Sequence, residues 1–188
     1  MAQSVRQYRL LVFASAFTCL MFELIISRVA DFHLGSRNSY LAIPITFLGL
    51  ALGSLHVHAR PKIIASFNLK RNLVLLAGVA VITIITIYIL FSQYFSVIGA
   101  GSDTHYTGYL FAKTGVFIGL FILPFYFFGR VLTICYHLNR EQIGRIYSAD
   151  FFGAALGCFL TPILFHFISL PAVVTVLMGA IFLLVLVF

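Results

Sequence analysis

The sequence predicts an all-α fold, a polytopic integral membrane bundle of six transmembrane helices. Hydrophobic residues make up 62% of the 188 residues, against roughly 45–50% in an ordinary soluble domain. Charged residues make up only 9%, where about 25% is typical. Long apolar segments also recur six times between short polar stretches. A soluble protein with so few charged residues could not cover so large an apolar core with polar surface. In a lipid bilayer, apolar side chains contact the lipid tails directly.

Each segment is close to the length of a spanning helix, for which about 20 mainly apolar residues suffice. The predicted helices cover residues 10–29, 40–57, 73–91, 109–137, 146–167 and 170–188. Glu23 interrupts the first apolar run and no small-x-small cleavage site follows it. The first segment is therefore interpreted as a retained span and not as a signal peptide. Pro124 predicts a kink in the fourth segment, because proline removes a backbone hydrogen bond.

The distribution of basic residues predicts the orientation of these segments. The N-terminal residues and the loops after the second and fourth segments contain Arg6, Arg9, Arg60, Lys62, Lys70, Arg71, Arg140 and Arg145. The alternate loops contain Arg37 as their only Lys or Arg. Since Lys and Arg are retained in cytoplasmic loops, both termini are expected in the cytoplasm, and the expected location is a bacterial inner (plasma) membrane. The net charge of +7 then indicates contact with anionic headgroups and not with nucleic acid.

Two glycine pairs with Gly-x-x-x-Gly spacing predict close helix packing. Gly49 and Gly53 lie in the second segment, and Gly153 and Gly157 lie in the fifth. Each pair places two glycines one turn apart on one helix face, where another backbone can approach closely. A contact inside the bundle is the preferred interpretation, and a homodimer seam is the alternative.

A short echo between the two halves suggests internal symmetry. Ser27-Arg28-Val29 ends the first segment, and Gly129-Arg130-Val131 stands near the end of the fourth. Each precedes its glycine pair by a similar number of residues. Because the halves are three crossings apart, they would face opposite ways, as in the 3+3 inverted repeats of many transporters.

Charged groups at membrane depth are costly, and they usually have partners or a function. Glu23 is expected in the outer half of the bilayer, with Lys113 as its candidate partner. Arg28 competes for Glu23, although five residues is a poor spacing for a same-face contact. Arg130 and Asp150 form the second candidate pair, near the inner boundary. These pairs specify helix assembly in one interpretation, and Glu23 relays protons or substrate in the other.

The sequence predicts no catalytic, cofactor-binding or metal site. Cys19, Cys135 and Cys158 have no metal-ligand spacing, and an odd number argues against a disulfide framework. His56 and His58 diverge by about 200° on a helix, so a shared metal ion is not expected.

Two stretches have the order and spacing of a known family. The first contains Phe22-Glu23-Leu24-Ile25-Ile26-Ser27-Arg28-Val29, then His33-Leu34-Gly35-Ser36, then residues 47–54. The second covers residues 141–157, where Tyr147-x-x-Asp150 leads into a Gly-Ala-x-x-Gly stretch. Together they resemble the N-terminal membrane region of the membrane-bound spermidine-synthase-like proteins, over nearly the whole chain.

The resemblance implies a single transmembrane domain over residues 1–188 of a longer protein. In that family a multi-helix membrane region precedes a soluble domain similar to aminopropyltransferases, which bind decarboxylated S-adenosylmethionine and a polyamine. The chain is therefore expected to be a fragment that lacks a C-terminal cytoplasmic domain. No active-site residue of the family can be carried onto it.

The sequence is compatible with three functions. The first is a membrane anchor or scaffold domain of a spermidine-synthase-like protein, non-catalytic by itself. The second is a transporter-like module for a small polar or cationic solute, such as a polyamine. The third is an accessory subunit that contacts other membrane subunits or a second copy of itself. A polar cavity around Glu23 would indicate transport, and a dry bundle would indicate an anchor.

Overall fold

The computed structural model describes residues 2–34, 40, 42–60, 62–65, 68–97 and 104–187, and these residues form helices and short connections without a strand. The α-helices in this part of the chain are α1 (Ala2–Leu34), α2 (Ala42–Ala59), α3 (Lys62–Ala65), α4 (Leu69–Val97), α5 (Thr104–Leu138), α6 (Ile143–Phe167) and α7 (Leu170–Val187). A 3₁₀ turn, Arg140–Gln142, joins α5 to α6. The prediction of an all-α fold is confirmed.

Six long helices coincide with the six predicted segments, and most are longer than predicted. α1 begins at Ala2, before Arg6 and Arg9, and α4 extends to Val97. An apolar run marks only the part of a helix that lipid can cover, whereas backbone hydrogen bonds continue through polar residues. α5 runs without interruption through Pro124, the residue at which a kink was predicted.

Four stretches of the described chain are long and apolar enough to cross a membrane. They are Arg6–Val29 in α1, Ala42–Ala59 in α2, Ile118–Leu138 in α5, and Arg140–Phe167, which contains α6. Shorter apolar stretches lie in α4 and α7, at Arg71–Ile85 and Ala172–Leu183. Large apolar side chains such as Phe47, Phe151 and Phe159 are exposed on the outside of the bundle. Such a surface is that of a membrane protein.

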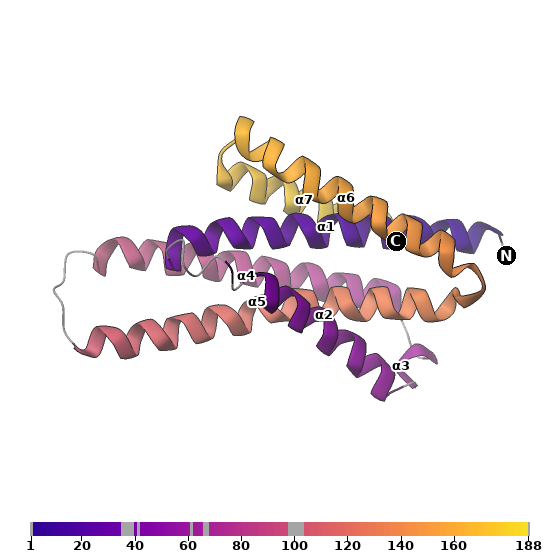
Figure 1. Ribbon diagram of the computed structural model, residues 1–188, viewed down its shortest axis with the longest axis horizontal. Helices are drawn as coiled ribbons and strands as arrows, with labels where there is room; N and C mark the ends of the chain where they lie inside the picture. Colours follow the sequence, from indigo (N-terminus) through magenta and orange to yellow (C-terminus); the bar gives the residue numbers. More distant parts are fainter. Residues whose placement is uncertain are drawn as a thin grey trace.

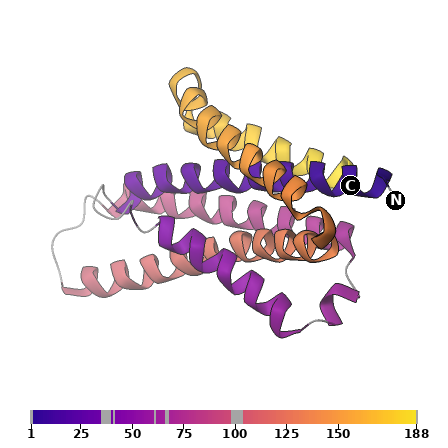
Figure 2. The same cartoon turned by 45° about the vertical axis from the view of Figure 1, so that its right-hand side comes forward.

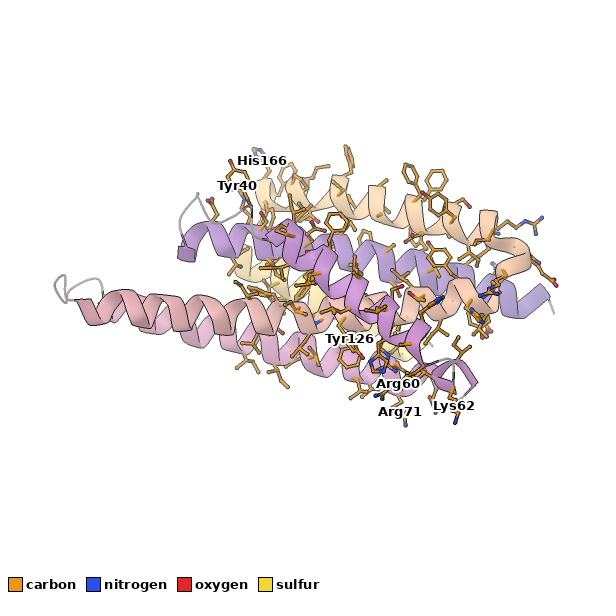
Figure 3. All side chains as sticks on the ribbon, turned by 60° about the horizontal axis from the view of Figure 1, so that its bottom comes forward. Tyr40, Arg60, Lys62, Arg71, Tyr126 and His166 are labelled. Atoms are coloured by element: carbon orange, nitrogen blue, oxygen red, sulfur yellow. The ribbon has the colours of Figure 1, made fainter. Side chains whose placement is uncertain are left out.

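α1, α4 and α5 run nearly along one axis, and α2 and α6 are tilted to it (Figure 1). Successive long helices point in opposite directions. Both chain termini lie at the same end of the bundle, which is called the terminal end below (Figure 2). Arg60, Lys62 and Arg71 also lie toward that end, while Tyr40 and His166 lie toward the other, the distal end (Figure 3). The basic loops and the termini therefore share one end.

The centre of the bundle is a packed apolar core. Phe22 of α1 and Phe125 of α5 are buried there with their ring centroids 5.6 Å apart. The same cluster includes apolar side chains of α2, α4 and α7. A second cluster at the terminal end contains Leu11, Leu73 and Ile146. The helices thus enclose side chains over much of their shared length.

Candidate functional site

A close contact between α2 and α5, the α2–α5 seam, contains the first glycine pair. A Cβ atom at Gly49 would lie 2.9 Å from the Ile122 carbonyl oxygen, and one at Gly53 would collide with the Tyr126 carbonyl oxygen. Gly129 of α5 faces the backbone of Leu50 in the same way. Because glycine has no Cβ atom, two backbones can come this close at these positions.

The second glycine pair forms the α1–α6 seam. A Cβ atom at Gly153 would lie 3.1 Å from the Phe13 Cα atom, and one at Gly157 would lie 2.6 Å from the Phe17 carbonyl oxygen. Both glycines are buried. The structure thus places each glycine pair in a contact within one chain.

The two seams have equivalent geometry. In each, a later glycine meets a later residue of the partner helix, so α2 lies parallel to α5 and α6 lies parallel to α1. Arg28 and Arg130 do not occupy equivalent positions relative to the two seams. Arg130 stands about one turn beyond Tyr126, beside Gly53, whereas Arg28 stands about three turns beyond Phe17.

A pocket of about 330 Å³ opens between α1 and α6 beyond the glycines, toward the distal end. It is lined by Leu24, Ser27, Arg28 and Asp31 of α1 and by Pro162 and Phe165 of α6. Arg28 Nη1 lies 4.0 Å from Asp31 Oδ2, and 60% and 36% of these two side chains are exposed. The Arg28 guanidinium carbon lies 5.9 Å from the Phe165 ring centroid. Charged, polar and apolar groups therefore meet in one cavity.

Glu23 does not line this pocket. It is half-buried in α1, and among the described side chains none forms a hydrogen bond or ion pair with it. Its predicted partner, the side chain of Lys113, lies outside the described residues. Arg28, the predicted competitor, contacts Asp31 instead, because a spacing of three residues brings two side chains to one helix face.

In the described part of the chain, Arg130 and Asp150, the second predicted pair, contact other side chains. The Tyr136 hydroxyl donates a hydrogen bond to Asp150, which joins α5 to α6. The Arg130 guanidinium carbon lies 5.8 Å and 6.0 Å from the ring centroids of Tyr126 and Phe127. Arg130 stands beside α2, and its side chain leans toward the preceding turn, as helical side chains do. Among the residues that the structure describes, its buried Nε atom has no hydrogen-bond partner.

His56 and His58 have separate environments. His56 Nδ1 lies 2.9 Å from the Tyr126 hydroxyl, across the α2–α5 seam, while His58 is exposed. The histidines diverge as their spacing on a helix requires. Cys19 and Cys135 are buried and Cys158 is exposed, and all three are free thiols.

Sequence reasoning missed Asp31, Ser27 and the two tyrosines that hold polar contacts. Asp31 had a signal, because it stands three residues after Arg28 where the apolar run ends. Tyr126 and Tyr136 had none, since their partners come from other helices.

Comparisons with protein-family models, with curated proteins and with solved structures found no match.

Proposed function

We propose that the chain is a membrane anchor or scaffold domain of a spermidine-synthase-like protein, non-catalytic by itself. The observation that supports this most is the packed apolar core around Phe22 and Phe125. A transport path through the centre would need polar side chains around a cavity, as at the midplane sites of transporters. The polar pocket lies off the core, between α1 and α6, and Glu23 is not among its lining residues.

In this proposal all six long helices cross a bacterial inner membrane, with both termini in the cytoplasm. Support comes from the alternating helix directions and from the basic residues gathered toward the terminal end (Figures 1 and 3). Lys and Arg are retained on the cytoplasmic side and attract anionic headgroups there. A soluble domain joined after α7 would then stand in the cytoplasm.

Accessibility of introduced cysteines tests this topology. In a background without the three native cysteines, Arg60→Cys and Tyr40→Cys place one thiol at each end, both at exposed positions. A membrane-impermeant maleimide is expected to label Tyr40→Cys in intact cells and Arg60→Cys only in inverted vesicles. Labelling of both positions from the same side would contradict the proposed crossing of α2.

The intact mass of the protein in its native membrane tests the anchor. A mass well above the 20.9 kDa of these residues, together with binding of an S-adenosylmethionine analogue, is expected for the anchor of an aminopropyltransferase-like domain. A mass equal to that of these residues would overturn it, and would favour the accessory-subunit alternative.

A transporter-like module is the second candidate, because one observation favours it. Both glycine seams join parallel helices, which fits a 3+3 inverted repeat of α1–α2–α4 and α5–α6–α7, an arrangement common in transporters. Uptake of labelled spermidine and putrescine by proteoliposomes separates the two functions. An anchor is expected to give the rate of protein-free liposomes, whereas saturable uptake that Glu23→Gln abolishes would establish transport.

A further inference from the structure

The pocket between α1 and α6 lies where an apolar helix face ends. The apolar stretch of α1 runs from Arg6 to Val29, and the α1 side of the pocket runs from Leu24 to Asp31. Its other wall is close to the end of α6, at Phe167. Tyr40 lies toward the same end of the bundle (Figure 3), as tyrosines do at the boundary between lipid tails and headgroups. If α1 and α6 cross the membrane as proposed, the pocket lies at headgroup depth.

The two charges in the pocket are available to a ligand. The Arg28–Asp31 separation of 4.0 Å is at the limit of an ion pair, and more than a third of each side chain is exposed. Exposed pairs of this kind are weak, so little is lost when a ligand separates them. The guanidinium has five N–H donors and the carboxylate has only acceptor sites, so each retains unused capacity.

The charge pattern selects the class of ligand. A polyamine would be repelled by Arg28, and a polyanion would be repelled by Asp31. A group with one negative and one positive charge a few bonds apart matches both side chains. Leu24, Pro162 and Phe165 supply apolar walls, and the volume of about 330 Å³ lies at the small end of ligand sites.

We propose that this pocket binds a phosphate–ammonium zwitterion, with the chemistry of the phosphatidylethanolamine headgroup. The phosphate oxygens accept hydrogen bonds from Arg28, which suits phosphate in particular. The primary ammonium donates hydrogen bonds to Asp31, with Ser27 beside it in the pocket wall. A choline headgroup has no N–H to donate, and a glycerol headgroup has no positive charge. The same zwitterion reaches the pocket from the bilayer or as a free headgroup from solution.

Lipid binding by the purified chain tests the site. Native mass spectrometry in detergent, with phosphatidylethanolamine, phosphatidylcholine and phosphatidylglycerol at matched concentrations, gives a Kd for each. The wild type is expected to bind phosphatidylethanolamine about tenfold more tightly than either other lipid, the effect of roughly one charge-assisted hydrogen bond. Equal binding of all three lipids would overturn the proposal.

Two variants test separately what Arg28 and Asp31 contribute to headgroup binding. Arg28→Gln is expected to weaken binding of all three phospholipids about tenfold, because each contains the phosphate. Asp31→Asn is expected to weaken only phosphatidylethanolamine, and so to remove the preference over phosphatidylcholine. Arg60→Gln, an exposed arginine toward the terminal end, is the matched control and is expected to bind as the wild type.

Size exclusion and circular dichroism check that each variant folds. If Arg28→Gln does not fold, Arg28→Lys replaces it and is expected to retain weaker phosphate binding without bidentate geometry. Wild-type lipid preference in Asp31→Asn would refute the site.

Soluble glycerophosphoethanolamine distinguishes the two sources of the zwitterion. If it displaces phosphatidylethanolamine at millimolar concentration, the headgroup alone is sufficient and a free zwitterion is a ligand. If only the intact lipid binds, the ligand comes from the bilayer. Both outcomes support the pocket chemistry, and neither depends on whether the domain is an anchor or a transporter.

Discussion

The α2–α5 seam and the α1–α6 seam are both packed through a glycine pair, but different structures lie beyond the glycines. Both bring parallel helices together through two glycines one turn apart. The α2–α5 seam also has Gly129 on its second helix and continues into the rings of Tyr126 and His56, whose centroids are 5.8 Å apart. The α1–α6 seam has glycine on α6 only, and it opens into the pocket beyond Pro162.

The residues that bring two helices close are therefore different from the residues that form a pocket. In both seams the glycines let two backbones come close, since a Cβ atom at Gly53 or Gly153 would collide with a carbonyl oxygen of the partner helix. The residues one to three turns further along decide whether rings fill the space or a cavity remains. Arg130 lies beside the rings of Tyr126 and Phe127, while Arg28 lies at an open pocket.

Added methyl groups in the seams are expected to have the largest effect. Gly53→Ala and Gly153→Ala each place a Cβ atom against a backbone that cannot move alone. We expect each to lower the free energy of unfolding by about 3 kcal/mol, the upper part of the range for overpacking. Unfolding in mixed detergent micelles measures the change.

Gly78→Ala in α4 and Gly179→Ala in α7 are the matched controls, because a Cβ atom at either position meets nothing within 4 Å. They are expected to change stability by less than about 1 kcal/mol, in the stabilising direction, since alanine favours a helix over glycine. A seam variant as mild as its control would mean that the seam is not a close contact. A large difference between the two seam variants would break their equivalence.

Removing one hydroxyl at each polar contact is expected to have an intermediate effect. Tyr136→Phe leaves Asp150 without its donor, and a hydrogen bond to a charged group contributes about 2 kcal/mol. Tyr126→Phe removes the 2.9 Å contact with His56, a single side-chain hydrogen bond of the kind that contributes about 1 kcal/mol. The same unfolding measurement ranks them, and the reverse order would show that the His56 contact matters more to the bundle.

Arg130→Met is expected to have the smallest effect. It removes two cation–π contacts of about 0.5–1 kcal/mol each, and it also removes a buried, unpartnered Nε–H that costs about 1–3 kcal/mol. We expect a net change below about 1 kcal/mol. A loss of 3 kcal/mol or more in lipid would instead indicate an anion bound to Arg130, and the two seams would then both hold charged ligands.

The sequence predicts the positions of the helices well, because long apolar segments are recognisable by their length and composition. It places helix ends poorly, since α1 and α4 continue through residues that are not apolar. The orientation, the six crossings and the family resemblance remain predictions.

The polar contacts could not be predicted for a different reason. The choice of Tyr136 for Asp150 and of aromatic rings for Arg130 depends on which helices are neighbours. Hydropathy alone contains no information on neighbours. The predicted inverted repeat aligns Arg28 with Arg130 by their flanking residues. The seam contacts place these two arginines at positions that differ by about two helical turns. Short motifs of common membrane residues match by chance too easily to fix a register.

The parallel direction of each seam has a consequence for how the chain is made. Parallel neighbours are never consecutive in a chain that reverses direction at every connection, so α1 emerges from the ribosome long before α6, which begins at Ile143. The α2–α5 seam needs only residues up to Leu138. Since synthesis proceeds from the N-terminus, all residues of that seam are made before α6, and α1 lacks its α6 neighbour until residues up to Phe167 follow. The lipid pocket is consequently among the last parts of the domain to exist.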